Sequence, residues 1–116
     1  KWLKHTTSLS LSNNNLDDEG IFLLSKTNCL PRLTSLDLSS NEIGALGAKV
    51  LSLSKSLNSI CSLNISYNRI ESLGIHSLVN SDFGRQLKFL QLRDICLGNE
   101  GMRSFSSFRL DDLKSL

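Results

Sequence analysis

The sequence predicts an α/β solenoid, a curved right-handed arc with a parallel sheet on its concave face and helices on its convex face. One pattern, clearest in Leu33–Ile43, places leucines at positions 33, 36 and 38 ahead of Asn41 and Ile43. The same spacing returns at a shift of 27 residues, so that four copies share one frame. Each copy also passes from a strand-like alternation to a helix-like spacing. A fixed period of this length is typical of repeat architectures.

The copies divide residues 1–116 into a single repeat domain. Its units span about residues 6–32, 33–59, 60–86 and 87–112, and a fifth unit begins at 113. Neither end shows the polar cap with which terminal repeats normally shield their open face. We therefore expect the chain to be a fragment of a longer array.

The first half of each unit is predicted to be a short strand. Residues 36–39 (Leu-Asp-Leu-Ser) alternate apolar and polar side chains, and residues 63–66 (Leu-Asn-Ile-Ser) repeat that alternation. A period of two places one set of side chains on a core and the other set in solvent.

The second half of each unit is predicted to be a helix. Two apolar columns lie three residues apart and therefore share one helical face. These columns are Ile21, Ala48, Ile75 and Met102, and Leu24, Leu51, Leu78 and Phe105. The predicted N-cap residues also occupy one column, namely Asp18, Ser72 and Asn99, with Ala45 as the exception.

A glycine recurs in each predicted helix, at positions 20, 47, 74 and 101. A helical glycine costs about 1 kcal/mol relative to alanine. Its return in register predicts a close approach of each helix to its strand, where a Cβ would not fit.

An asparagine column follows the strands, at Asn14, Asn41 and Asn68. The backbone must turn there, and its buried N–H and C=O groups need partners. An Asn side chain supplies two donors and an acceptor, so these residues are predicted to bridge one coil to the next. Ile95 breaks the column, and we expect local irregularity around it.

The curvature follows from two packing distances. Neighbouring strands lie ~4.8 Å apart, whereas packed helices lie ~8–10 Å apart. The helical side of the stack is therefore wider, and the sheet is expected on the inside of the bend.

The motif Leu33-x-x-Leu36-x-Leu38-x-x-Asn41-x-Ile43, with its period and its glycines, closely resembles the leucine-rich repeat. It looks like the ribonuclease inhibitor-type subclass, which carries a full helix on the convex side. The resemblance covers nearly the whole chain and implies a protein-interaction scaffold that binds a partner protein through its concave face. It also leaves two alternatives: a GTPase-activating or other regulatory scaffold similar to Ran GTPase-activating proteins, and a ligand-sensing array of an immune receptor or a bacterial effector.

The predicted concave face is small and polar in its first two units and gains larger side chains later. Its solvent-facing columns are Ser8, Ser35, Ser62 and Phe89; Ser10, Asp37, Asn64 and Gln91; Ser12, Ser39, Ser66 and Arg93; and Asn13, Ser40, Tyr67 and Asp94. Because aromatic and Arg side chains dominate interface energetics, the predicted partner-binding residues are Asp37, Asn64, Tyr67, Phe89, Gln91 and Arg93. A purely structural alternative is that Phe89 covers a neighbouring repeat and Arg93 pairs with Asp94.

Composition excludes several other functions. A net charge of +2 and few aromatic residues argue against nucleic acid and against a charged membrane as partners. The histidines, His5 and His76, share no column with a cysteine or carboxylate, so we predict no metal, no cofactor, no small-molecule substrate and no catalytic residues. The three cysteines have no shared spacing and are predicted to be buried, reduced and structural, which favours the cytoplasm.

Overall fold

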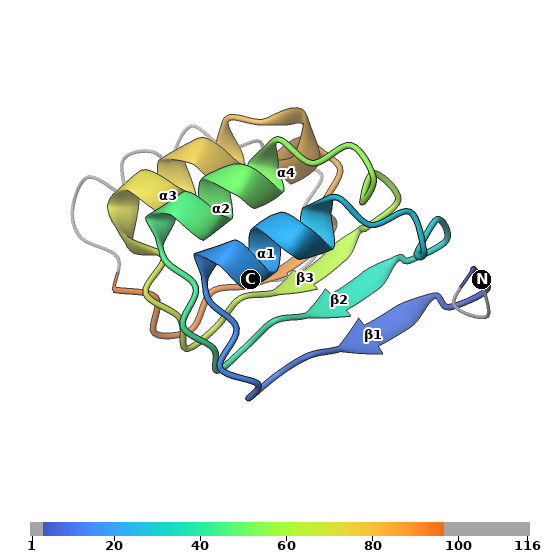
Figure 1. The fold of residues 1–116 in the computed structure, drawn as a ribbon. Helices are drawn as coiled ribbons and strands as arrows, with labels where there is room; N and C mark the ends of the chain where they lie inside the picture. The colour runs from blue at the N-terminus through green and yellow to red at the C-terminus, as the bar shows by residue number, and fades with distance from the viewer. Residues whose placement is uncertain (1–3, 97–116) are drawn as a thin grey trace.

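A computed structural model describes residues 4–96 of the chain, and these form one layer of strands and one layer of helices (Figure 1). The strands are β1 (Ser8–Ser10), β2 (Ser35–Asp37), β3 (Ser62–Asn64) and β4 (Phe89–Gln91). The helices are α1 (Asp18–Ser25), α2 (Ala45–Ser52), α3 (Glu71–Val79) and the short α4 (Asp82–Arg85). All the helices lie over the same face of the sheet. The predicted α/β solenoid is confirmed for this part of the chain.

The strands form one parallel sheet in the order of the sequence, β1-β2-β3-β4. Each central leucine pairs with the leucine one repeat away, as Leu36 does with Leu9 and Leu63. The residues on either side of these leucines face away from the helices, and that side is called the concave face below. Its first two predicted columns are confirmed in register, because Ser62 pairs with Phe89 and Asn64 pairs with Gln91.

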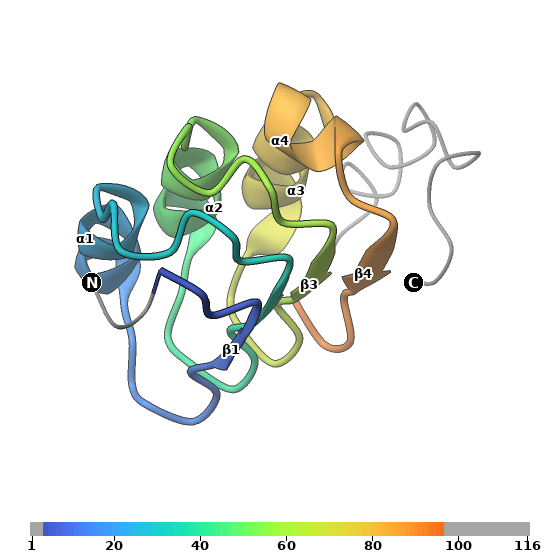
Figure 2. The ribbon, with the colours of Figure 1, turned by 90° about the vertical axis from the view of Figure 1, so that its right-hand side faces the viewer.

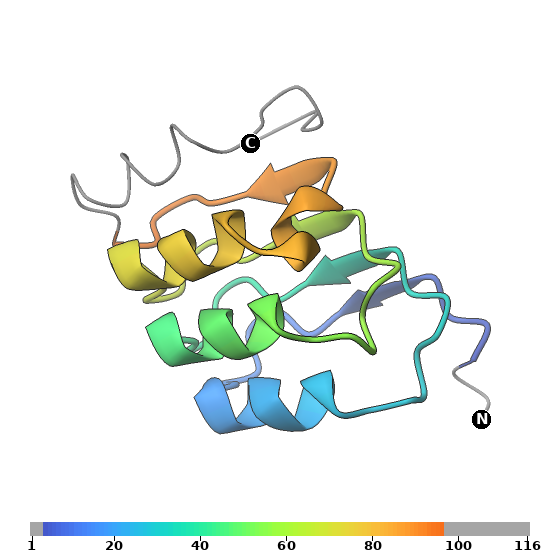
Figure 3. The same cartoon turned by 90° about the horizontal axis from the view of Figure 1, so that it is seen from above.

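The core lies between the sheet and the helices, which Figure 3 shows stacked side by side above it. Ile21, Ala48 and Ile75 of the first predicted helical column are buried, as are Leu51 and Leu78 of the second. Leu24 in the first repeat is only partly buried. The predicted positions of Met102 and Phe105, and most of the fourth unit, lie outside the described residues.

The predicted bridging of one coil to the next is confirmed for Asn41 and Asn68, and the hydrogen bonds of the asparagine column are called the asparagine ladder below. The N–H groups of Asn14 and Leu16 each donate to Asn41 Oδ1 at 2.9 Å, and Asn41 Nδ2 donates to Leu11 O at 3.1 Å. One repeat later, Asn68 Nδ2 donates to Leu38 O at 2.9 Å. The side chains of Asn41 and Asn68 therefore bond the backbone of the preceding coil, whose turn groups need partners once they are buried in the stack. The Asn14 side chain instead donates to Ser12 O of its own coil at 3.0 Å.

The ladder ends at Ile95, where the predicted irregularity appears. Ile95 is buried and has no side-chain amide, and its backbone carbonyl instead accepts from Glu71 N–H at 2.9 Å. Glu71 has a φ angle of 63°, in the left-handed region, whereas the equivalent Asp17 and Gly44 have φ angles of −114° and −107°. The backbone at Glu71 thus departs from the conformation of the earlier repeats and donates to the Ile95 carbonyl, where the Asn side chain is missing.

The predicted N-cap column is wrong by one residue or more. Asp17, not Asp18, caps α1, because its side chain accepts from Gly20 N–H at 3.0 Å. Asp18 Oδ1 instead accepts from Gly44 N–H at 2.7 Å, and so it covers the start of α2, whose own N-cap is a glycine. Ser72 lies inside α3, and Asn99 lies outside the described residues.

The reason predicted for the glycine column needs correction. A Cβ on Gly74 would lie 3.1 Å from Ala45 Cα and from Ala48 Cβ, which belong to α2. It would also lie 2.6 Å from Ile70 Cγ2, one turn earlier in its own repeat. Gly74, and Gly47, where a Cβ would lie 2.5 Å from Asp18 Oδ1 of α1, thus allow neighbouring helices to approach each other, rather than each helix to approach its strand.

The third repeat contains one helix more than the sequence predicts. Ser81 starts α4 by accepting from Gly84 N–H at 3.0 Å. Gly84 stands in the column of the buried Leu30 and Leu57, and the buried Phe83 beside it supplies an apolar side chain. A short extra helix thus fills the core where the leucine is missing.

Candidate functional site

The structure places four of the six predicted binding residues on the strands of the concave face. Asp37, Asn64 and Gln91 form one row across β2, β3 and β4, since each pairs with the next. Phe89 lies two residues before Gln91 on β4 and has 43% of its surface exposed. Figure 2 shows β3 and β4 side by side at one end of the sheet.

Two members of this row are held by their own turns. Asp37 Oδ1 accepts from Ser39 N–H at 3.0 Å, and Asn64 Oδ1 accepts from Ser66 N–H at 3.0 Å. Both side chains are half-buried. One side-chain oxygen of Asp37 and of Asn64 is therefore already bonded to the backbone of its own turn. Gln91, in contrast, is exposed.

The other two predicted residues lie next to each other beyond the carboxyl ends of β3 and β4. Tyr67 N–H donates to Arg93 O at 2.7 Å. Tyr67 is 47% exposed and Arg93 is exposed. The backbones of Tyr67 and Arg93 thus lie side by side beyond the carboxyl ends of these strands, whereas Phe89 is the first residue of β4.

Tyr67 has a strained backbone. Its φ angle is 58°, and the equivalent residues Asn13, Ser40 and Asp94 have φ angles of 60°, 57° and 54°. Every described repeat therefore makes its turn through a left-handed residue. Asn and Asp tolerate this conformation, but a bulky aromatic residue rarely adopts it.

One predicted solvent-facing residue is instead part of the core. Ser66 is only 4% exposed, and its Oγ accepts from Arg93 N–H at 2.9 Å. Arg93 makes no ion pair within residues 4–96, so the predicted structural alternative of a pair with Asp94 is not seen there. Phe89, at 43% exposure, is also not covered by the described part of its neighbours.

The helical face carries exposed apolar side chains that the sequence analysis did not single out. Leu46 and Leu73 are 62% and 70% exposed, and they occupy the same column of neighbouring helices. Phe22, Leu23 and Leu53 are also exposed. The available signal was that these positions fall outside both buried helical columns.

The cysteine prediction is wrong for two residues. Cys29 and Cys96 are exposed and Cys61 is half-buried, although all three are free thiols. Within residues 4–96, no group of three or more metal-ligating side chains could hold an ion. None of the helices described there has the length and the apolar character needed to span a bilayer.

Comparison with known proteins bears on these repeats directly. A family model described as Leucine Rich repeat matches residues 4–25 and 30–52. Nothing matches among curated proteins. The register of the sheet carries the same pattern on through β3 and β4. Residues 4–25 and 30–52 are therefore leucine-rich repeats, a kind of repeat that generally mediates protein–protein interaction and is typically a non-enzymatic binding scaffold.

Proposed function

We propose that the chain binds a partner protein through the concave face, at the end formed by β3 and β4. The observation that carries this proposal is the exposure of Tyr67, Phe89 and Arg93, of which Arg93 makes no ion pair within residues 4–96. Aromatic and Arg side chains are the residues that most often dominate interface energies. Gln91, Asn64 and Asp37 would then form the polar row that continues from these anchors.

The size of this surface limits the affinity. Four strands at a spacing of ~4.8 Å span ~19 Å, and a specific interface uses about 800 Å² on each partner. The concave face of these repeats is therefore a partial footprint. We propose that further repeats, of the same ribonuclease inhibitor-type subclass, extend it. The constant shift of 27 residues along the ladder and the helix in each unit support that subclass.

The proposed role is non-catalytic and cytoplasmic. Two exposed free thiols, Cys29 and Cys96, suit a reducing compartment better than an oxidising one. If the purified chain accelerated GTP hydrolysis by a small GTPase, the alternative of a regulatory scaffold would replace a role limited to binding.

Site-directed photo-crosslinking tests the binding surface. A photoreactive amino acid would be placed at position 89, on the concave face, or at position 73, on the helical face. Position 89 is expected to give a discrete crosslinked adduct in cell extract, and Arg93→Ala together with Tyr67→Ala should abolish it. Adducts formed equally at position 73, or unaffected by the two substitutions, would contradict the proposal.

A further inference from the structure

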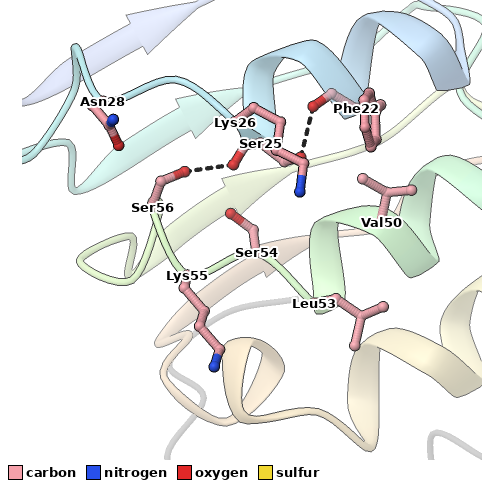
Figure 4. Close-up of a pocket in the computed structure, with 9 residues that line it drawn as sticks. All are labelled: Phe22, Ser25, Lys26, Asn28, Val50, Leu53, Ser54, Lys55 and Ser56. Atoms are coloured by element: carbon pink, nitrogen blue, oxygen red, sulfur yellow. Dashed lines mark hydrogen bonds between the residues drawn. The ribbon is translucent and has the colours of Figure 1, made fainter.

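A groove lies between the C-terminal ends of α1 and α2, on the side of the molecule away from the concave face (Figure 4). It has a volume of about 690 Å³, within the range of about 300–1,000 Å³ that is usual for ligand pockets. Residues 22–28 form one wall, and residues 50–56 form the other. This groove is separate from the surface proposed above.

The groove contains a buried hydroxyl without a partner. Within the part of the chain that the structure describes, Ser54 Oγ is buried and makes no hydrogen bond. The equivalent hydroxyls in the adjacent repeats are both used, since Thr27 Oγ1 accepts from Cys29 N–H and Ser81 Oγ donates to Leu78 O. Leaving a buried polar group unpaired costs about 1–3 kcal/mol. Among the described residues of this column, Ser54 is thus the one whose hydroxyl makes no hydrogen bond.

Apolar side chains border this hydroxyl. Phe22 and Val50 lie close together on facing helices, and Leu53 lies at the end of α2 (Figure 4). Phe22 and Leu53 are 47% and 69% exposed, so their apolar surface has no cover from the described residues. A ligand with an apolar side chain would remove that surface from water.

The charged side chains that line the groove are all positive. Lys26 and Lys55 belong to its lining, which contains no acidic residue. Lys26 Nζ lies 5.2 Å from the centre of the Phe22 ring, which holds the ammonium beside the apolar wall. Each helix C-terminus contributes about −0.5 charge, and two full positive charges exceed that sum. The groove therefore favours an anionic ligand.

We propose that this groove binds an acidic peptide segment of a partner protein, in which a Glu or Asp neighbours a large apolar residue. A rotation about χ1 of the half-buried Ser54 turns its hydroxyl from the buried position into the groove that the residue lines, where the carboxylate accepts from it. Lys26 and Lys55 attract the same carboxylate. The apolar side chain packs between Phe22 and Leu53. The chain then has two binding surfaces, one on each face.

Fluorescence polarisation tests this proposal with the chain and a labelled peptide in which Glu alternates with Leu. Ser54→Ala should weaken binding about three- to tenfold, because one hydrogen bond to a charged group is lost. The same variant should melt at the same or a higher temperature, because it removes a buried, unpaired hydroxyl. A purely structural role for Ser54 would instead lower the melting temperature.

Charge and apolar contact are tested separately. Lys26→Gln with Lys55→Gln should weaken binding about tenfold and reduce its salt dependence, whereas Lys49→Gln on exposed α2 surface should not. Leu53→Asp should weaken binding, whereas Leu73→Asp, at 70% exposure, is the matched control. Equal binding of a peptide with Gln in place of Glu would overturn the proposal. No binding to the unmodified chain, or binding of anionic lipid vesicles in place of the peptide, would overturn it too.

Discussion

At the scale of single residues, the side chains of Asn41 and Asn68 make more hydrogen bonds than any other side chain in the described part of the protein. Asn68 is only 3% exposed, and its Nδ2 donates to Leu38 O, Ile65 O and Ser66 O within 2.9–3.2 Å, while its Oδ1 accepts from Ile43 N–H. Asn41 makes an equivalent set of bonds but is only half-buried. Asn14, at the start of the ladder, is exposed.

We predict that the stability lost on replacement by alanine follows this burial. Asn68→Ala should lose the most, about 3 kcal/mol or more, because several buried backbone groups each lose a partner at about 1–3 kcal/mol. Asn41→Ala should lose less, and Asn14→Ala least. Denaturant melts measure all three.

Asn58→Ala is the control for that series, because Asn58 is exposed in a loop. Asn15 would be a poor control, since its φ angle of 57° makes an alanine there costly by itself. Equal losses at positions 68, 41 and 58 would contradict the ladder.

Tyr67 allows binding and stability to be separated. Tyr67→Asn should change the free energy of unfolding by less than about 1 kcal/mol, because relief of the left-handed backbone offsets the lost packing of a half-exposed ring. Partner binding should nevertheless fall. Ser40→Asn is the matched variant in the same column; it should gain stability and leave binding unchanged. A large loss of stability in Tyr67→Asn would show that the ring is structural.

At the scale of elements, the contact between helices decides which glycines are required. Gly74 is enclosed by Ile70 of its own repeat and by the backbone of α2 at Ala45. The nearest atom to a Cβ on Gly20 is Leu16 Cδ2 at 3.1 Å, the end of a flexible side chain. The first helix has no described helix on its outer side, and so its glycine has more room.

Gly74→Ala is therefore expected to destabilise the protein by about 1–3 kcal/mol, the usual cost of overpacking, although alanine is the better helix former. Gly20→Ala should be neutral or should stabilise the protein by up to about 1 kcal/mol, because alanine has the higher helix propensity and its Cβ meets little steric hindrance there. Thermal unfolding of both variants measures the difference. If both substitutions stabilised the protein, the close approach of α2 and α3 would be wrong.

At the scale of the whole molecule, the length of the repeat and the register of the sheet could be predicted because each repeat packs its strand and its helix in the same way. Leu9, Leu36, Leu63 and Leu90 fall on one line of the sheet because their spacing in the sequence equals one coil. The concave columns follow from the same spacing. The burial of Ser66 could not be predicted this way, because it depends on where Arg93 N–H lies.

The features that escaped prediction depend on neighbouring coils rather than on period. Asp18 was expected to cap its own helix, yet its carboxylate reaches Gly44 of the next repeat. The second helix of the third repeat arises from Ser81 and Gly84, where a leucine is missing. The groove around Ser54 exists only because two coils stack with a hydroxyl between them. Contacts of this kind become visible only in three dimensions.

Stability is expected to vary along the array, because the first repeat is the least enclosed. Leu9 and Leu11 are partly buried, whereas Leu36 and Leu38 are 1% and 0% exposed. Leu11 N–H donates to Asp37 O and Leu38 N–H donates to Asn64 O, both at 2.8 Å. Because the two bonds are equal in length, a difference in amide exchange between them reports local opening rather than bond geometry.

Native-state hydrogen exchange should therefore show Leu38 N–H exchanging at least about tenfold more slowly than Leu11 N–H. The difference should disappear in denaturant near the midpoint of unfolding, where global opening dominates both amides. Equal protection without denaturant would mean that all described repeats open as one cooperative unit. The half-buried leucines of the first repeat would then be as well protected as the enclosed ones, and nearest-neighbour stacking would not set the stability of this array.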